Sequence, residues 1–411
     1  MIAKLSKYKD IPQASIFLSG SKSESNRLLI LQALYPDIEI ANIASCDDTN
    51  VLQKALASQE DTLDIHHAGT AMRFLTAYLA ATTQKEITLT GSPSMLQRPI
   101  GPLVEALRDM GAAVTYTAAQ GYPPLKIAPA VLSGNVTIDA SESSQYISAL
   151  VLIGPYLKKG LTLTLMGNIT SKPYIDMTLS LLSSIGVEST FKGQDIRILP
   201  LTKSSKVRIA VEGDWSSASY FYSLVALSKK RCVHLSSFKT NSLQADAALA
   251  KLYEPLGVIT TAIDSQTIAL LKNDAPLPAG FKADLTPSPD LAQTIAVTCF
   301  GLGIACHLTG LHTLKIKETD RLVALQNELT KLGAVVHITQ DTLLLESHEI
   351  AFENRTQDIE IATYDDHRMA MAFGVLAELF CVTIQDPMVV TKSYPAFYSD
   401  LKKMGISADF C

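Results

Sequence analysis

The sequence predicts an α/β protein of two similar domains, each assembled from three repeats of a helix followed by a short strand. With 411 residues and 47% hydrophobic content, the chain is longer than one hydrophobic core usually serves. A leucine-spaced helix stopped by glycine before a strand recurs in LVEALRDMGAAV, LSLLSSIGVEST, LAKLYEPLGVIT, LQNELTKLGAVV and LKKMGISADF. The glycines lie 75, 71, 76 and 72 residues apart, which indicates a repeated unit of about 70 residues.

Each of these glycines is expected to end its helix, because a left-handed residue must precede the turn into the strand. They are Gly111, Gly186, Gly257, Gly333 and Gly405. A weaker first copy at 51–65 suggests six units, which group most simply as three plus three. Turn-forming residues near 19–21 and 212–215 mark the crossings. We therefore expect one domain of residues 1–20 and 213–411, holding both termini, and a similar inserted domain of residues 21–212.

The bulk properties exclude several classes of protein. A net charge of −5 and a pI near 5.9 argue against nucleic acid or a membrane surface as the main partner. The six cysteines form no CxxC pair and show no metal spacing with histidine, so we expect a reduced cytoplasmic protein without a metal. The most apolar window, residues 294–311, is interrupted by Gly301, Gly303 and His307. It predicts a buried helix followed by a buried strand, and no membrane span.

The most informative segment contains Lys317, Glu318 and Arg321, placed where an alternating apolar pattern gives way to helical spacing. The helix that follows buries a stripe made of Leu322, Leu325, Leu329 and Leu332. We expect the charged residues to lie in its first turn, where free N–H groups and the helix dipole favour anions. Glu318 beside two cations is a candidate for proton transfer. The alternative is an exposed i, i+3 ion pair between Glu318 and Arg321.

Cations also stand at helix starts in the first half of the chain. Lys22, Ser23 and Arg27 open a helix after the strand-like ASIFL, which suits a phosphate although the segment is not a P-loop. Gly69 begins a short loop in which the backbone could approach a ligand closely. Arg98 precedes a proline on a rigid turn, as an anion clamp or a solvated side chain.

Hydroxyl groups open two further helices. Ser143, Ser144 and Gln145 precede an apolar helix, and Ser171 and Tyr174 precede another. Clustered hydroxyls suit recognition of a phosphate or a polyol. Helix capping is the favoured reading for each serine taken singly.

The second half repeats this arrangement. Asp290 is the last polar residue before an apolar helix, where an aspartate usually caps and acts as a base only beside a substrate hydroxyl. His367 follows Asp366 and precedes Arg368, whose charge disfavours a bound metal. Lys392 precedes the last helix, and a solvated lysine is the default expectation there.

Charged residues recur at so many helix starts that ligand binding is favoured over helix capping, because independent helix caps would not need so many cations. The positive charges at helix starts are Lys22, Arg27, Arg98, Lys317, Arg321, Arg368 and Lys392. On an acidic protein they indicate a small polyanionic substrate held in the cleft between the two domains. The chain shows no Ser/His/Asp nucleophile elbow and no dinucleotide GxGxxG, so covalent hydrolysis and hydride transfer lose support.

The order of these motifs closely resembles the 5-enolpyruvylshikimate 3-phosphate (EPSP) synthase family of enolpyruvyl transferases, over nearly the whole chain. The matching segments are GSKSESNR, AGTAMR, QRPI, SSQ, SKPY, EGDWSSASY, PD, KETDR, DHRMAM and the final lysine. The resemblance implies the enolpyruvyl transferase fold, in which the three α/β units of each domain surround a pseudo-threefold axis. It implies transfer of the enolpyruvyl group of phosphoenolpyruvate to the 5-hydroxyl of shikimate 3-phosphate, in aromatic amino acid biosynthesis.

The resemblance also assigns residues, without a cofactor. The expected ligands of shikimate 3-phosphate are Lys22, Ser23, Arg27, Ser143, Ser144, Ser171, Tyr174, Asp290, Thr313 and Lys317. The expected ligands of phosphoenolpyruvate are Lys22, Gly69, Arg98, Gln145, Arg321, Arg368 and Lys392. Asp290 is the expected base toward the 5-hydroxyl, and Glu318 with Lys22 the proton-transfer pair at the methylene carbon. Which of Lys22, Glu318 and Lys392 gives each proton stays open.

Three residues depart from the family pattern: His67 and Thr313 replace usual asparagines, and Phe74 replaces a usual proline. Gly69 keeps the small residue of the family, so inhibition by glyphosate at the phosphoenolpyruvate site is expected. The related transferase acting on a UDP-sugar is a weaker match, because it lacks KETDR and carries a reactive loop cysteine. A non-catalytic anion-binding module is the alternative from another class. A monomer is expected.

Overall fold

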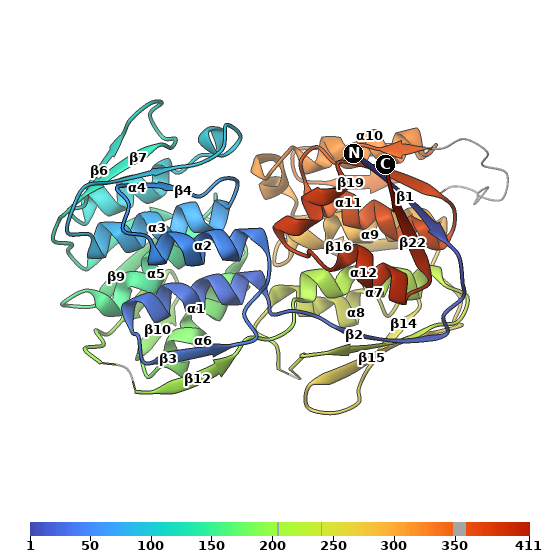
Figure 1. The fold of residues 1–411 in the computed structure, drawn as a ribbon, viewed down its shortest axis with the longest axis horizontal. Helices are drawn as coiled ribbons and strands as arrows, with labels where there is room; N and C mark the ends of the chain where they lie inside the picture. The colour runs from blue at the N-terminus through green and yellow to red at the C-terminus, as the bar shows by residue number, and fades with distance from the viewer. Residues whose placement is uncertain (204, 240, 348–358) are drawn as a thin grey trace. The chain divides into compact units, whose positions relative to one another are not determined.

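The computed structural model describes residues 1–203, 205–239, 241–347 and 359–411, which form two compact units. One comprises Met1–Ser19 and Glu212–Cys411 and is called the terminal unit here. The other, Gly20–Val211, is called the inserted unit (Figure 1). Among the described residues each unit holds three small sheets with helices packed against them, and all but the two-stranded sheet of the inserted unit are mixed.

The inserted unit contains six helices within its described residues. They are α1 (Lys22–Leu34), α2 (Asp47–Ala57), α3 (Gly69–Thr82), α4 (Gly101–Asp109), α5 (Ser144–Ile153) and α6 (Lys172–Ser184). The first sheet is β4 (Thr62–Asp64), β5 (Ile87–Thr90), β7 (Leu125–Ala128) and β6 (Ala113–Tyr116). The second is β10 (Ser189–Lys192), β11 (Asp195–Ile198), β9 (Leu161–Met166) and β8 (Asn135–Asp139). A two-stranded sheet pairs β12 (Val207–Ala210) with β3 (Ile38–Ala41).

The terminal unit repeats this composition. Its helices are α7 (Trp215–Leu227), α8 (Leu249–Leu252), α9 (Ala292–Leu302), α10 (Arg321–Lys331), α11 (His367–Gly374) and α12 (Phe397–Lys403). One sheet is β14 (Val258–Ala262), β15 (Thr267–Lys272), β13 (Cys232–Ser236) and β2 (Gln13–Phe17). The next is β16 (Gly280–Asp284), β17 (Ala305–Thr309), β19 (Leu343–Leu345) and β18 (Val336–Ile338). The last is β20 (Glu360–Ile361), β21 (Val382–Gln385), β1 (Ile2–Lys7) and β22 (Ile406–Phe410).

Five of the described sheets share one pairing pattern, in which a parallel pair is extended by two antiparallel pairings. In the second sheet of the inserted unit, β8 runs parallel to β9, while β11 pairs antiparallel with both β9 and β10. In the last sheet of the terminal unit β1 takes the place of β11, between β21 and β22. The N-terminal strand thus completes a sheet made from the end of the chain, and the predicted repeated α/β architecture is confirmed.

The five stopping glycines have the conformation that the repeat requires. Their φ angles are positive, +102° at Gly111, +89° at Gly186 and +86° at each of Gly257, Gly333 and Gly405. Each glycine follows a helix of the repeat and precedes its strand. At Gly405 a Cβ atom would lie 2.1 Å from the carbonyl oxygen of Lys9, so this position admits only glycine.

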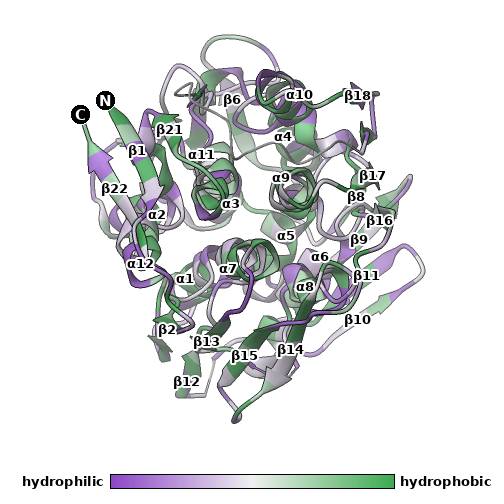
Figure 2. Cartoon of the chain, turned by 90° about the vertical axis from the view of Figure 1, so that its right-hand side faces the viewer, coloured by the Kyte–Doolittle hydropathy of each residue, from purple (hydrophilic) through white to green (hydrophobic). Residues whose placement is uncertain are grey.

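The core of the terminal unit is formed around α7, α9 and α11, which Figure 2 views almost along their axes, with the sheets outside them. These helices are buried nearly all round, and small hydroxyl residues of α7 and α9 bond to each other between the helices. The hydroxyl of Ser219 lies 3.1 Å from that of Thr294, and Ser223 lies 2.7 Å from Thr298. The expected helix and strand in residues 294–311 are confirmed as α9 and β17.

A membrane-crossing helix was not expected from the composition. Throughout the described residues, the helices are too short or too polar to cross a bilayer. All six cysteines are free thiols.

Candidate functional site

The predicted chemistry gathers at the starts of the buried central helices of each unit. In the inserted unit, α1 begins at Lys22, α3 at Gly69 and α5 at Ser144. In the terminal unit, Asp290 precedes α9, and α11 begins just before Arg368. Each unit therefore carries its own cluster of candidate residues.

The cluster of the terminal unit is organised around Arg321, whose guanidinium is 2% exposed and contacts three carboxylates. Its Nε donates to Asp366 Oδ2 at 2.6 Å, and its Nη1 donates to Asp290 Oδ1 at 2.8 Å. Its Nη2 donates to Glu318 Oε2 at 2.9 Å. Burial opposes the charge, yet the three carboxylates prevail and raise the pKa of Arg321. The exposed ion pair weighed as an alternative for Glu318 and Arg321 is wrong, because the pair is buried.

Asp290 connects this cluster to two further cations. Its Oδ2 accepts from Arg368 Nη2 at 3.0 Å, and Lys317 Nζ lies 3.4 Å from its Oδ1. Burial raises the pKa of this carboxyl, but Arg368, Lys317 and Arg321 together hold it well below its usual value. The side chain makes no helix-capping hydrogen bond among the described residues, so both of its oxygens serve the cations.

Glu318 links Arg321 to Lys392. Lys392 Nζ lies 2.8 Å from Glu318 Oε1, and both side chains are largely buried. The default expectation of a solvated lysine at position 392 is therefore wrong. A lysine and a carboxylate in direct contact form a pair that can exchange a proton with a bound ligand.

The helix after KETDR begins later than the sequence predicted. α10 starts at Arg321, so Lys317 and Glu318 precede the helix instead of lying in its first turn. Asp320 caps it and accepts hydrogen bonds from the N–H groups of Leu322 and Val323. Because that carboxylate already satisfies the helix terminus, the anion-binding capacity here comes from the side-chain cations.

The cluster of the inserted unit also contains a buried arginine, Arg27, but its hydrogen-bond partners are neutral oxygens instead of carboxylates. Arg27 donates to the hydroxyls of Thr178 at 2.8 Å and Ser148 at 3.0 Å, and to the carbonyl of Ser23 at 2.8 Å. Its guanidinium carbon lies 5.3 Å from the ring centre of Phe74 and 5.8 Å from that of Tyr174. Among the described residues no carboxylate forms an ion pair with it. Burial lowers the pKa of Arg27 to about 10, with Tyr174 and Glu24 opposing the shift.

The candidate serines divide into two kinds. Ser143 caps α5, since its hydroxyl accepts from the N–H of Gln145 at 3.2 Å. Ser144 is nearly buried beside it. Ser171 precedes α6 with a left-handed φ of +50°, and its hydroxyl makes no capping bond within the described residues. The capping expectation is thus confirmed at Ser143 and wrong at Ser171.

Lys22 lies in the first turn of α1 and is held by a carboxylate. Its Nζ donates to Asp48 Oδ2 at 3.1 Å, and Asp48 is 2% exposed. The other carboxylate oxygen of Asp48 accepts no hydrogen bond from the described residues. Asp48 was not singled out from the sequence, because nothing in a DDTN helix start distinguishes it from a cap.

Gly69 and Arg98 are in close contact. A Cβ atom on Gly69 would lie 2.6 Å from Arg98 Nη1 and 3.0 Å from Arg73 Nη1. Arg73 donates to the carbonyls of Gly69 at 3.1 Å and Pro99 at 2.9 Å, which fixes the turn that carries Arg98. Gln145 reaches the same helix start, where its Nε2 lies 3.5 Å from the hydroxyl of Thr70.

The three departures from the family pattern have distinct surroundings. Phe74 is fully buried beneath Arg27. The hydroxyl of Thr313 is buried and has no hydrogen-bond partner among the described residues. His67 is half-buried in the loop before α3.

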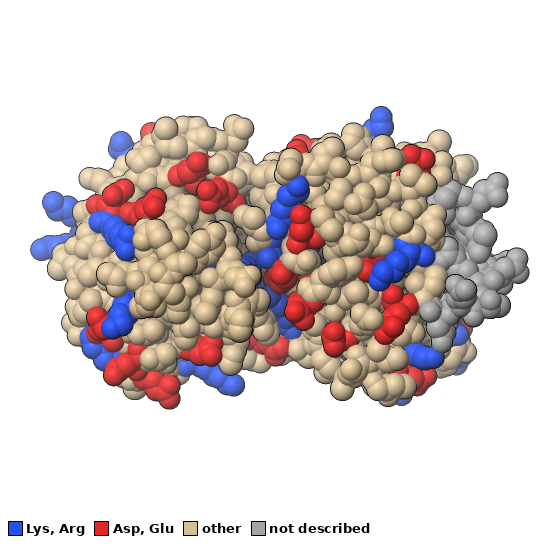
Figure 3. All heavy atoms as spheres, turned by 90° about the horizontal axis from the view of Figure 1, so that it is seen from above, with Lys and Arg blue, Asp and Glu red and all other residues tan. Residues whose placement is uncertain are grey.

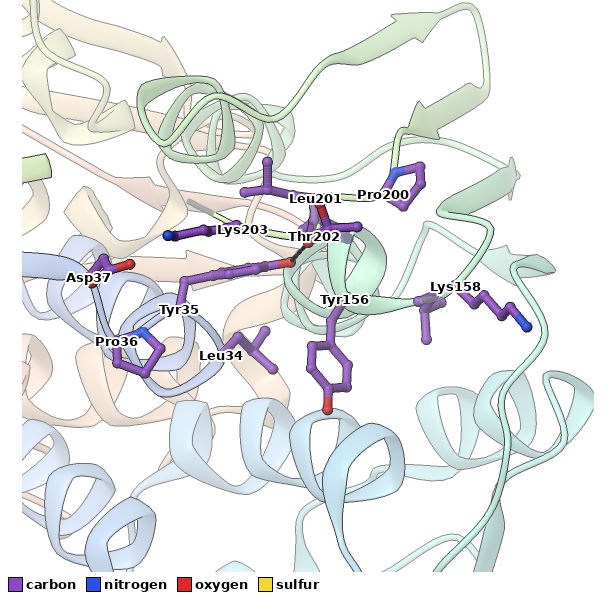
Figure 4. Close-up of a pocket in the computed structure, with 12 residues that line it drawn as sticks. Leu34, Tyr35, Pro36, Asp37, Tyr156, Lys158, Pro200, Leu201, Thr202 and Lys203 are labelled. Atoms are coloured by element: carbon purple, nitrogen blue, oxygen red, sulfur yellow. Dashed lines mark hydrogen bonds between the residues drawn. The ribbon is translucent and has the colours of Figure 1, made fainter. Parts of the chain in front are cut away.

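The candidate clusters do not coincide with the cavity in the inserted unit. On the face drawn in Figure 3, acidic and basic side chains are interspersed. A cavity of about 400 Å³ in the inserted unit is lined by Tyr35, Pro155 and Leu201 among others, and holds none of the candidate residues (Figure 4). The Tyr35 hydroxyl donates to the carbonyl of Leu201 there, so its polar group already has a partner. The described residues include no group of three or more histidine, cysteine or acidic side chains placed to hold a metal.

Comparison with known proteins gives these clusters a family. Residues 51–401 match the family model of EPSP synthase (3-phosphoshikimate 1-carboxyvinyltransferase). A 3-phosphoshikimate 1-carboxyvinyltransferase of Bacteroides fragilis is 44% identical over 96% of this chain and 95% of its own length. That of Escherichia coli is 34% identical over 95% and 96%. An EPSP synthase structure from Acinetobacter baumannii covers both chains fully with a TM-score of 0.79 at 20% identity, which shows the fold. The chain belongs to the EPSP synthase family.

Proposed function

We propose that this chain transfers the enolpyruvyl group of phosphoenolpyruvate to the 5-hydroxyl of shikimate 3-phosphate and releases phosphate. The observation that carries the proposal is the buried cluster in which Arg321 contacts Asp290, Glu318 and Asp366. In this cluster the side chains of the PD, KETDR and DHRMAM segments of the family contact one another. The Bacteroides fragilis and Escherichia coli relatives carry the corresponding name.

Shikimate 3-phosphate is assigned mainly to the inserted unit. Arg27, Ser143, Ser144 and Ser171 supply a cation and hydroxyls for its phosphate. Arg27 is suited to this because its charge is buried without an ion pair among the described residues, so that an anionic ligand offsets its desolvation. Ser171 is suited because its hydroxyl is not used as a cap. Ser23, Tyr174, Thr313 and Lys317 complete the assignment.

Phosphoenolpyruvate is assigned to cations of both units, Lys22 and Arg98 from the inserted unit and Arg321, Arg368 and Lys392 from the terminal unit. Gly69 lets the Arg98 guanidinium lie close to the backbone, where a Cβ atom would clash, and Gln145 lies at the same helix start. Because a single chain supplies all the assigned residues, a monomer is sufficient for the reaction. We infer a cytoplasmic monomer.

The reaction needs a proton donor and a base. Protonation of the methylene carbon of phosphoenolpyruvate gives C2 cationic character, and the 5-hydroxyl oxygen attacks C2 as it loses its proton. The tetrahedral ketal then expels phosphate, and the methyl group returns the added proton. We assign Glu318 to both methyl proton steps, which is supported by Lys392 beside it, and Lys22 of the inserted unit to the same carbon.

Asp290 is assigned as the base toward the 5-hydroxyl. For this role its pKa must rise when phosphoenolpyruvate binds. In the free protein three cations make it a weak base. Phosphoenolpyruvate would bring negative charge to Arg321 and Arg368, so the pKa of Asp290 would rise when the substrate binds. The acid limb of kcat should therefore lie at higher pH than that of kcat/KM. Coincident limbs would count against this role.

A phosphate-release assay tests the function. The wild-type protein should release phosphate only when both substrates are present. Glu318→Gln and Asp290→Asn should each lower kcat at least 100-fold, at the lower end of what a positioned acid or base contributes. Glu346→Gln and Asp341→Asn are matched controls, because each makes the same change at an exposed carboxylate that pairs with a histidine. Undiminished turnover of Glu318→Gln would overturn its assignment, and a wild-type protein without phosphate release would overturn the proposed function.

A further inference from the structure

We propose that Asp246 is a positioning residue for Arg368, and that it acts through the hydroxyl of Ser216. The inference rests on the proposed function, in which Arg368 holds phosphoenolpyruvate. Neither Asp246 nor Ser216 has a role in that assignment. The two residues approach Arg368 from different elements, Asp246 from a 3-10 turn at Ala245–Ala248 and Ser216 from the first turn of α7.

The three groups form a chain of contacts. Arg368 Nη2 donates to Ser216 Oγ at 3.3 Å, and it also donates to Asp290 Oδ2 at 3.0 Å. Ser216 Oγ donates in turn to Asp246 Oδ2. Asp246 is 2% exposed, so this contact lies within the protein interior.

The direction of these hydrogen bonds is fixed by chemistry. A guanidinium only donates, so the Ser216 oxygen must accept from Arg368. The single hydroxyl proton is then available for Asp246, which accepts it best as a carboxylate. A protonated Asp246 would instead donate to Ser216, whose oxygen can accept from both donors, and the serine proton would then lose its acceptor in this chain of contacts. The ionised form of Asp246 therefore favours the contact that orients the Arg368 fork.

The position of Asp246 is costly for the fold. Its Oδ1 is buried and accepts no hydrogen bond from any residue that the structure describes. Burial raises the pKa of Asp246 to about 7; Asp290 and Asp214 add to the rise, while Arg368 and Ser216 oppose it. These groups face it from η4 (Pro289–Leu291), the cap of α7 and α11. A neutral side chain would avoid this cost, so packing alone gives no reason for a carboxylate here.

A double-mutant cycle tests the relay. Ser216→Ala and Asp246→Ala should each raise the KM for phosphoenolpyruvate roughly ten-fold, the usual loss for a hydrogen bond to a charged group. The double variant should show the same rise, because either change already breaks the chain. The KM for shikimate 3-phosphate should stay within about two-fold. Ser223→Ala is the control, since Ser223 lies on the same helix and its hydroxyl bonds to the core residues Tyr253 and Thr298.

Additive effects in the cycle, or equal rises in both KM values, would overturn the proposal. Wild-type turnover is measured in the same assay, so failure of the proposed function and failure of the relay give different results. Loss of wild-type phosphate release contradicts the former. Normal wild-type release with an unaffected Ser216→Ala variant contradicts the latter.

The Asp246→Asn variant separates positioning from a structural role. A folded-state pKa raised to about 7 means that ionised Asp246 destabilises the protein above the unfolded pKa of about 4, with the full cost reached above pH 7. Asp246→Asn should therefore resist urea better than the wild type at pH 8 and equally at pH 4. The variant should still bind phosphoenolpyruvate more weakly than the wild type. The pH profile of its kcat/KM should lack the ionisation of Asp246 near neutral pH. A variant that is more stable and binds normally would contradict the proposal.

Discussion

The two units each bury an arginine, and they compensate its charge in opposite ways. In the terminal unit, Arg321 contacts Asp290, Glu318 and Asp366. In the inserted unit, Arg27 lies between two aromatic rings and donates to hydroxyl and carbonyl oxygens. The same side chain is therefore stabilised as a cation in one unit and destabilised as a cation in the other.

The difference indicates a division of labour. An arginine that is already paired holds its carboxylates in place, and these carboxylates are the groups that can move protons. An arginine without an ion pair keeps its charge available for a ligand. We therefore expect the terminal unit to determine the chemistry and the inserted unit to determine the affinity for shikimate 3-phosphate.

The largest expected effect is on stability, from Arg321→Met. Removing the cation takes one partner from each of three buried carboxylates and leaves Asp366 without its arginine, and breaking a buried ion pair typically costs about 3–5 kcal/mol. The single tryptophan, Trp215, lies in the terminal unit and is buried, so its fluorescence in urea reports this unfolding. Arg208→Met at an exposed ion pair is the control. A midpoint unchanged by Arg321→Met would break the comparison.

Arg27→Met should behave in the opposite way. The change strands no carboxylate, and the hydroxyls of Thr178 and Ser148 already lie 3.2 Å apart and can bond to each other. The free energy of unfolding should shift by no more than about 1 kcal/mol, because replacing a buried charge by an apolar group is often neutral. The KM for shikimate 3-phosphate should rise about 100-fold, as charged hydrogen bonds are lost. A strong loss of thermal stability with normal KM would reverse this interpretation.

Acid should weaken the terminal unit through Asp290. Its pKa is lowered in the folded state, so its contribution to stability is present above the unfolded value of about 4 and is lost as the pH falls below it. Asp290→Asn should flatten the decline of the unfolding free energy in this range, measured by Trp215 fluorescence. If the unfolding free energy of Asp290→Asn declines with falling pH as steeply as that of the wild type, Asp290 is not stabilised by the cations as described.

Gly69→Ala should crowd the phosphoenolpyruvate side of the inserted unit. The added Cβ atom would lie 2.6 Å from Arg98 Nη1, and the guanidinium must move because it is the flexible partner. We expect the KM for phosphoenolpyruvate and the glyphosate concentration for half inhibition to rise about ten-fold, for an overpacking cost of roughly 1–2 kcal/mol. Gly101→Ala is the control, because a Cβ atom at this first residue of α4 would lie 3.5 Å from the Cα atom of Gly121, an ordinary van der Waals contact. Identical inhibition curves for Gly69→Ala and wild type would contradict the assignment of this site.

The smallest expected effect is from Phe74→Leu. The ring lies 5.3 Å from the guanidinium carbon of Arg27, and a buried cation–π contact contributes roughly 1–2 kcal/mol. The KM for shikimate 3-phosphate should rise about five-fold while that for phosphoenolpyruvate is unchanged. Phe221→Leu, a buried ring that packs on Tyr394, controls for loss of volume. Equal effects of the two variants on KM would remove Phe74 from the binding of the substrate.

Local rules were sufficient for much of the fold. A leucine stripe and a stopping glycine determine where each repeat ends, and all five glycines have positive φ. Long-range strand pairing is not encoded locally, so the two-stranded sheet of β3 and β12 could not be anticipated from the repeat. The start of α10 was misplaced because the side chain of Asp320, which caps the helix, lies within the charged run itself.

The candidate site was predicted as a list of positive charges, and its pairing was not. Asp366 is separated from Arg321 by 45 residues along the chain, and no periodicity connects them. For the same reason Lys392 was expected to be solvated, although it is buried against Glu318. Ser171 and Ser143 have the same sequence signal, and only backbone geometry distinguishes the free hydroxyl from the cap.

The position of β1 has a consequence for the order of biosynthesis. Leu5 pairs with Val382 on one side and with Ala408 on the other, so this strand is synthesised long before either of the strands it pairs with. At about 5–20 residues per second, translation delays those neighbours by roughly 20–80 s. During that interval the backbone of β1 has two unpaired edges, which are open to association with other nascent chains. Residues 20–211, by contrast, are contiguous and can complete their sheets while the ribosome is still working.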